Sequence, residues 1–124
     1  GLSPSRARPI AGSYDARRRV LTLVQYSGPV AGAPYVNSMW EHQREPYKGD
    51  VVNSYNDGPP EPGKPPLGPF YELESSSPAA ALAPGESLTH VHRTLHFRGS
   101  ESELDPIARK SLGVSIADIR SAFP

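Results

Sequence analysis

The side chains between residues 86 and 97 alternate in character, apolar on one side and polar on the other. Because successive side chains of a β-strand point to opposite faces, a period of two predicts a strand with one apolar and one polar face. The two sets are Val91, Leu95 and Phe97 on the apolar face, and His90, His92 and His96 on the polar face. This segment therefore predicts a strand and gathers three histidines along one of its sides.

Four further segments are rich in β-branched and aromatic residues, which favour strands. These segments are 20–26, 35–40, 50–55 and 70–74. The chain also contains 15 prolines and 11 glycines, so many of its connections are expected to be turns and loops. Many of the prolines fall within 58–69, which predicts an extended, polyproline-like loop. The sequence therefore predicts a strand-dominated domain.

The last quarter of the chain changes its pattern. Asp105 followed by Pro106 is typical of a helix start, and Gly113 is typical of a helix end. Ser115 and Asp118 form a capping-box pattern in which Asp replaces the usual Glu or Gln. We therefore expect two short helices at the C-terminus.

Composition narrows the classes of partner. Lys and Arg (13) balance Asp and Glu (13), whereas a nucleic-acid-binding domain normally carries a basic excess. The one basic run, residues 17–19, is interpreted as the solvated end of a hairpin. No apolar stretch approaches the about 18 residues that a membrane span requires, and the absence of cysteine excludes disulfides and thiolate metal sites. We therefore expect neither nucleic acid nor a membrane span, and no feature assigns a cellular compartment.

Two stretches, 70–75 and 82–87, with Pro78 between them, resemble the C-terminal signature of galactose mutarotases (aldose 1-epimerases). In that signature, a strand with a Leu-Glu pair precedes a proline, a short strand and a Pro-Gly-Glu turn into the last long strand. The wider run from residue 51 to His96 is more specifically similar to an uncharacterised bacterial family classed as mutarotase-like, and this resemblance covers residues 13–119. Domains of that family are longer, so the chain is similar to their C-terminal part.

The resemblance implies an antiparallel β-sandwich, part of the galactose mutarotase fold, with a cleft of the size of a sugar. The expected fold class is therefore mainly β, with two short C-terminal helices. The expected organisation has three segments: an extended N-terminal arm at 1–13, a β-sandwich domain at 14–99 with the proline-rich loop 58–69, and a helical segment at 100–124.

By this resemblance, Glu74 is the base that removes the proton of the anomeric hydroxyl, and Glu72 lies on the same strand face. If both face the cleft, their mutual repulsion raises one of the two pKa values. The alternative is that both are ordinary exposed carboxylates. Mutarotases also use a histidine acid upstream of the region present here, so we expect an aldose to bind without faster interconversion of its anomers. Trp40, beside a polar loop, is a candidate for stacking on the sugar, and its alternative place is the core.

The histidines allow a second interpretation. His90 and His92 lie roughly 6.6 Å apart along a strand, a spacing at which two imidazoles can bind one divalent ion, as in cupin barrels. His96 and a carboxylate from a neighbouring strand, Glu72 or Glu74, would complete the site. The alternative is a polar face on which the histidines hydrogen-bond to neighbours. Apart from this divalent metal, no cofactor is expected.

Three functions are compatible with these patterns. The first is a carbohydrate-related, mutarotase-like binding domain for a sugar-type small molecule. Its ligand-binding residues would be Glu72, His90, His92, His96 and Trp40. The second is a structural subunit that self-associates into a homo-oligomer through open strand edges, and the third is a cupin-like metal-binding module. We favour the first without catalysis; an enzyme of this kind would be an aldose 1-epimerase-like isomerase.

Overall fold

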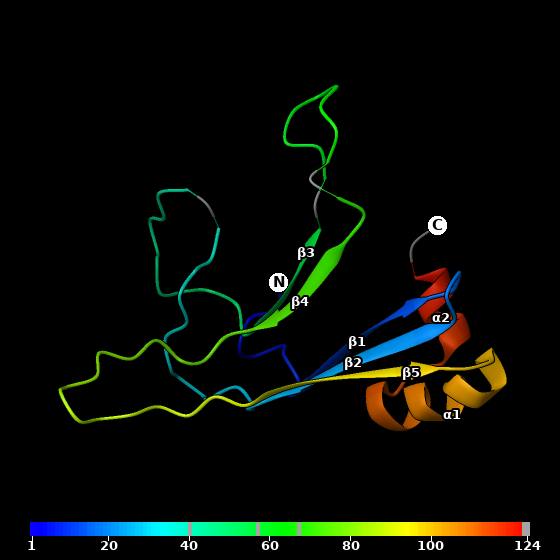
Figure 1. Ribbon diagram of the computed structural model, residues 1–124. Helices are drawn as coiled ribbons and strands as arrows, with labels where there is room; N and C mark the ends of the chain where they lie inside the picture. Colours follow the sequence, from blue (N-terminus) through cyan, green and yellow to red (C-terminus); the bar gives the residue numbers. More distant parts are fainter. Residues whose placement is uncertain (40, 57, 67, 123–124) are drawn as a thin grey trace. The chain divides into compact units, whose positions relative to one another are not determined.

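The computed structural model describes residues 1–39, 41–56, 58–66 and 68–122 (Figure 1). The chain forms two compact units, and the strands and helices are divided between them. One unit, here called the loop unit, consists of Gly1–Ala7 and Pro29–His90. The other, here called the helical unit, consists of Arg8–Gly28 and the chain from Val91 onward.

The helical unit contains a three-stranded antiparallel sheet in the order β1-β2-β5 (Figure 1). Its strands are β1 (Ile10–Asp15), β2 (Val20–Tyr26) and β5 (His92–Arg98). The bounds of β2 are those that its β-branched and aromatic residues predict. β1 begins inside the segment 1–13, where we expected an extended arm, because the backbone from Ile10 onward pairs with β2.

The alternation found in the sequence holds within β5. Leu95 and Phe97 pack against the buried core. His92 and His96 are exposed on the other face of the strand. The predicted strand 86–97 is nevertheless too long at its start, since residues 86–91 form no strand. β5 begins at His92 because its partner β2 ends at Tyr26, the residue directly opposite.

Two helices follow the sheet, as the pattern of the tail predicts. They are α1 (Glu101–Leu112) and α2 (Ile116–Ser121). The predicted start of α1 at Asp105 is wrong, because Ser100 and Glu103 form a capping box upstream of it. The Glu103 N–H donates to Ser100 Oγ at 3.3 Å, and the Ser100 N–H donates to the Glu103 carboxylate at 2.8 Å. In the described part of the chain, no helix has the length and apolar character needed to cross a membrane.

Asp105 stabilises the second helix instead of starting the first. Its carboxylate accepts a hydrogen bond from the Ile116 N–H at 2.8 Å and another from Arg109 Nε at 2.6 Å. The bond from Arg109, and then the bond from Ile116, lower the pKa of Asp105 below its ordinary value. Asp105 therefore joins the middle of α1 to the first turn of α2.

The segment between the helices has the caps that the sequence predicts. Gly113 ends α1 with a φ of 79°, a left-handed conformation in which glycine has no steric penalty. Ser115 and Asp118 form the capping box of α2, with the Asp118 N–H donating to Ser115 Oγ at 3.0 Å. These two local signals fix the turn between the helices.

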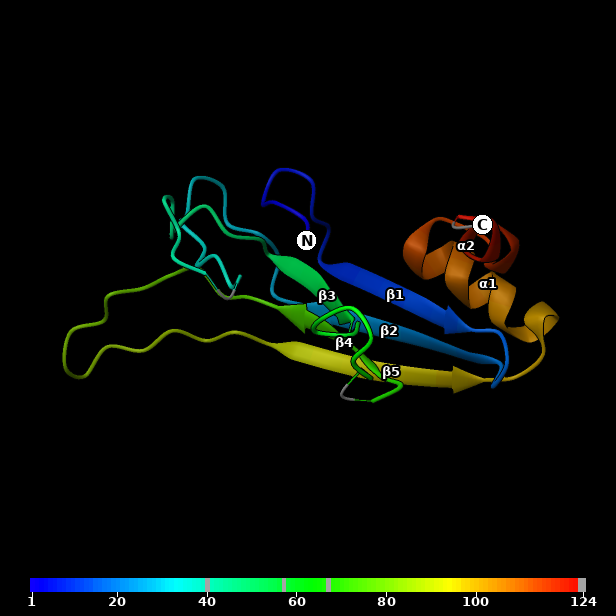
Figure 2. The same cartoon turned by 90° about the horizontal axis from the view of Figure 1, so that it is seen from above.

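Both helices pack on one face of the sheet, and Figure 2 shows them beside the end of β1. Gly12 in β1 lets α1 come close, since a Cβ atom there would lie 2.9 Å from the Leu112 side chain. The core contains two residues of β2 and three residues of the helices. These residues are Leu21, Leu23, Leu104, Ala108 and Ile116.

The loop unit contains a two-stranded antiparallel sheet joined by long connections. Its strands, β3 (Val52–Asn56) and β4 (Tyr71–Ser75), lie close to the predicted segments 50–55 and 70–74. The proline-rich segment 58–69 connects them and contains no helix or strand in its described residues, as predicted.

The predicted strand at 35–40 is wrong for residues 35–39, which the structure describes. Tyr35 is almost fully buried but forms only an isolated bridge with Lys48. Its hydroxyl accepts a hydrogen bond from the Val30 N–H at 3.0 Å. Val36 and Met39 are exposed. Of these apolar residues, Tyr35 alone therefore anchors this loop in the loop unit. Trp40 lies outside the described residues.

The predicted fold class, mainly β with antiparallel sheets and two short C-terminal helices, is confirmed. The two sheets belong to different units. Their packing into a sandwich stays a prediction.

Candidate functional site

One face of the β3–β4 sheet presents two glutamates. Alternate residues of a strand share a face, so Glu72 and Glu74 of β4 lie on the same side, as the sequence predicts. Across the sheet, Tyr55 is the partner of Glu72 and Asn53 is the partner of Glu74. Both glutamates and Tyr55 are exposed, whereas Asn53 is half-buried. These four residues are called the carboxyl face below.

The carboxyl face is hollowed beside Glu74. The hollow has a volume of about 690 Å³, which lies within the range of about 300–1,000 Å³ typical of small-molecule sites. It combines hydrogen-bonding groups with exposed apolar surface from one methionine and one tyrosine. The described residues that line it are Ser38, Met39, Asn53, Ser54, Tyr55 and Glu74.

The two carboxyl groups interact directly. A hydrogen bond with the Glu74 carboxyl raises the pKa of Glu72, and burial and repulsion by the Glu74 charge act in the same direction. The expectation that one pKa of the pair is raised is confirmed, although the hydrogen bond contributes more than the repulsion. A protonated carboxyl donates as well as accepts, so the pair in that form offers a ligand both kinds of hydrogen bond.

His90 is held on the other side of β4. Its Nε2 atom lies 2.9 Å from Ser75 Oγ, and the two side chains share a hydrogen bond. Ser75 follows Glu74 in the strand, and adjacent strand residues point to opposite faces. The structure therefore does not bring His90 to the carboxyl face.

The other two predicted histidines lie on β5 in the helical unit. His92 Nε2 is 3.3 Å from Thr94 Oγ1, and His96 Nδ1 is 3.0 Å from Thr22 Oγ1. Within the described ranges, no three His, Asp or Glu side chains are grouped so that they could hold a metal ion. The metal site stays a prediction. A rise of the melting temperature with Zn²⁺ that His92→Ala removes would support it, and no rise in the unmodified chain would count against it.

Sequence reasoning found Glu74 and missed most of its surroundings. Ser38 and Met39 come from the loop before β3 and carry no motif. The strand period shows that Asn53 and Tyr55 share one face of β3, but only the register of β3 with β4 places them on the face of the two glutamates. Trp40, the predicted stacking residue, lies outside the part of the chain that the structure describes.

Comparison with models of protein families gives a match over nearly the whole chain. The model of a family of unknown function (DUF6786) matches residues 1–123. No curated protein and no solved structure matches the chain. The expected similarity to an uncharacterised family is therefore confirmed in this general form. Because the match covers nearly the whole sequence, the chain belongs to the family of unknown function DUF6786.

Proposed function

We propose that the chain binds a carbohydrate in the hollow of the carboxyl face and does not by itself interconvert anomers. The observation that carries this proposal is the place of Glu74 in the wall of a hollow of about 690 Å³. The resemblance of residues 70–75 and 82–87 to galactose mutarotases supports it further, because that resemblance assigns Glu74 to the sugar.

The carboxyl face offers a partner to each part of a sugar ring. Oxygens of Glu74 and Glu72 accept hydrogen bonds from sugar hydroxyls, and the Asn53 amide both donates and accepts them. The Tyr55 ring, 47% exposed, and the Met39 side chain, 64% exposed, provide apolar surface for the C–H groups of the ring. None of the described residues lining the hollow is basic, which suits a neutral ligand.

Catalysis of anomer interconversion needs more than this face supplies. The reaction requires a base at the anomeric hydroxyl and an acid at the ring oxygen. Glu74 suits the role of the base, but the described lining of the hollow contains no histidine. His90 is hydrogen-bonded to Ser75 on the other side of β4. Because the loss of one partner typically slows such a reaction by about 10²–10⁴-fold, we propose binding alone.

Saturation-transfer NMR with D-galactose and D-glucose tests the binding. We expect transfer from the protein to the sugar protons, and we expect it to weaken in Glu74→Gln. Glu61→Gln is the matched control, because Glu61 is an exposed carboxylate of the same unit outside the hollow. No transfer with the unmodified chain, or equal transfer with both variants, would contradict the proposal.

Polarimetry of freshly dissolved α-galactose or α-glucose tests the absence of catalysis. We expect the optical rotation to reach equilibrium at the same rate with and without the protein. An acceleration that disappears in Glu74→Gln would instead make the chain an aldose 1-epimerase-like isomerase.

A second candidate function, self-association into a homo-oligomer, is favoured by the strand order. β1 and β5 are the outer strands of the three-stranded sheet, and outer strands can pair with strands of another molecule. Light scattering over a range of concentrations tests this candidate. A constant monomer mass would exclude it.

A further inference from the structure

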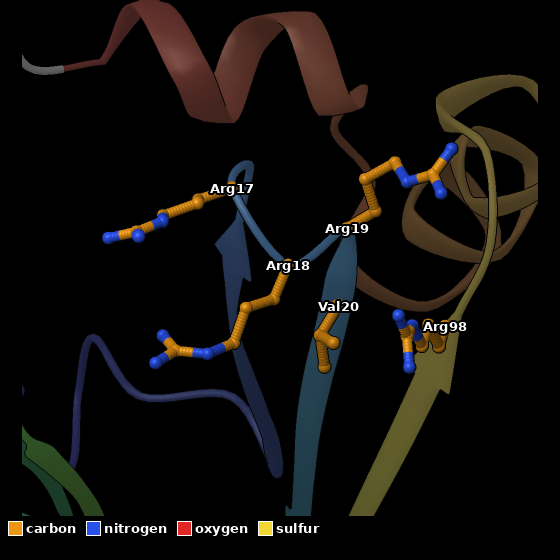
Figure 3. A pocket seen from close by; sticks show the side chains of 5 residues that line it. All are labelled: Arg17, Arg18, Arg19, Val20 and Arg98. Carbon is orange, nitrogen blue, oxygen red and sulfur yellow. The ribbon is translucent and has the colours of Figure 1, made fainter.

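Four arginines line a hollow in the helical unit (Figure 3). Arg17, Arg18 and Arg19 lie in the turn between β1 and β2, and Arg98 is the last residue of β5. The hollow has a volume of about 450 Å³, and Val20 also lines it. The sequence predicts the hairpin end correctly, but it does not indicate that Arg98 joins the three consecutive arginines.

The pairing of β2 with β5 brings Arg19 and Arg98 together. Val20 is the direct partner of Arg98, and the Gly99 N–H donates a hydrogen bond to the Arg19 carbonyl at 3.2 Å. Arg19 has a φ of 54°, so its side chain does not follow the alternation of the strand. Figure 3 shows Arg19 and Arg98 on the same side of the turn, while Arg17 and Arg18 extend to the other side.

Little of this positive charge is neutralised inside the helical unit. Arg18 forms an ion pair with Asp15 at 2.9 Å, which also accepts the Arg18 N–H. With the residues that the structure describes, Arg17, Arg19 and Arg98 form no ion pair. The formal net charge of the whole chain is +0, so the attraction for an anion at this place comes from local clustering.

An acidic group near Arg19, Glu103, is already engaged. Glu103 lies close enough for the charge of Arg19 to contribute to the lowering of its pKa, although hydrogen bonds from Ser100 are the larger causes. The Glu103 carboxylate accepts bonds from both the hydroxyl and the N–H of Ser100 in the capping box of α1. The guanidinium group of Arg19 therefore stays available to a ligand.

We propose that this hollow binds a phosphate group, held between the guanidinium groups of Arg19 and Arg98. A guanidinium group presents a planar set of donors that matches two oxygens of a phosphate, and it keeps its charge at every physiological pH. Arg17 adds attraction from the other side of the turn. The hollow is larger than one phosphate ion, so both free phosphate and a phosphate ester of a small molecule fit the proposal.

Isothermal titration calorimetry of the full chain with inorganic phosphate and with phenyl phosphate tests this site at constant ionic strength. We expect saturable binding of at least one of the two, weakened about tenfold or more by Arg19→Gln or Arg98→Gln. Arg93 is an exposed arginine of the same strand β5, and the Arg93→Gln variant should bind both anions as the unmodified chain does. Circular dichroism of each variant checks that it is folded, and Arg19→Gly provides a second variant without the charge.

The relative affinities identify the source of the phosphate. Tighter binding of phenyl phosphate assigns the site to a phosphate ester that also contacts Val20, and equal or tighter binding of inorganic phosphate assigns it to the free ion. No saturable binding of either anion would overturn the proposal. Equal weakening by Arg93→Gln would also overturn it, because the attraction would then depend on overall charge.

Discussion

Replacement of Arg19 by glycine should stabilise the protein. Arg19 is the one residue other than glycine that has a positive φ in the described part of the chain. For such a residue the left-handed conformation costs roughly 1–2 kcal/mol, which glycine avoids. Glycine also makes the unfolded chain more flexible, at a cost of about 0.4–1 kcal/mol. Arg19 is exposed, so little packing is lost, and the expected net gain is about 0.5–1 kcal/mol.

Urea unfolding followed by circular dichroism measures this gain, and a thermal melt should show a rise of about 2–6 °C. Arg17→Gly is the matched control, because it removes the same charge from the same turn at a residue without positive φ. We expect the control to lower stability by about 0.4–1 kcal/mol. Equal effects of the two substitutions, or a loss of stability in Arg19→Gly, would show that the backbone of Arg19 is not strained.

Three further changes test the packing and the carboxylates. Leu104→Ala should lower the free energy of unfolding by about 2–5 kcal/mol in urea titrations, since Leu104 is 2% exposed, whereas Leu88→Ala, at 46% exposure, should cost less than about 1 kcal/mol. The pKa of Asp118 is lowered by hydrogen bonds from Ser115, so this group adds stability above its unfolded pKa that is lost as pH falls through its folded pKa; Asp118→Asn should flatten the loss of stability measured below about pH 4. The raised pKa of Glu72 has the opposite effect on stability: Glu72 adds stability below its unfolded pKa, and this stability is lost as pH rises through the folded pKa. Glu72→Gln should remove that loss, and an unchanged pH profile of stability would contradict the interaction of the two carboxyl groups.

The sequence predicts the fold best where the signal is local. The bounds of β2 follow from a segment rich in β-branched and aromatic residues, and the turn between the helices follows from Gly113 and the capping box of Ser115. The start of α1 is harder, because two start signals compete. The capping box of Ser100 satisfies two backbone groups, and Asp105 then bonds to Ile116 of the next helix, a contact that no local pattern indicates.

Strands are predicted less well because a strand needs a partner. Residues 86–91 continue the alternation of β5, but β2 ends at Tyr26 and pairing stops there. Residues 35–39 have the composition of a strand, yet only Tyr35 among them is buried, and it pairs only through an isolated bridge with Lys48. Pairing between distant segments decides both outcomes, and composition does not report it.

The same limit applies to the two candidate sites. That Glu72 and Glu74 share a face follows from the strand period alone. Their partners Asn53 and Tyr55 depend on the register across the proline-rich connection, which the sequence does not encode locally. Arg98 likewise joins the three arginines of the turn between β1 and β2 only through the pairing of β5 with β2.

A two-dimensional amide NMR titration of the labelled chain with D-galactose tests carbohydrate binding at the carboxyl face residue by residue. We expect saturable shifts concentrated at Asn53, Tyr55 and Glu74, three of the four strand residues that line the hollow, and we expect their loss in Glu74→Gln. We expect no shift at Arg19 or its neighbours in the helical unit. A spectrum that does not change with sugar, or shifts that persist undiminished in Glu74→Gln, would contradict carbohydrate binding at the carboxyl face.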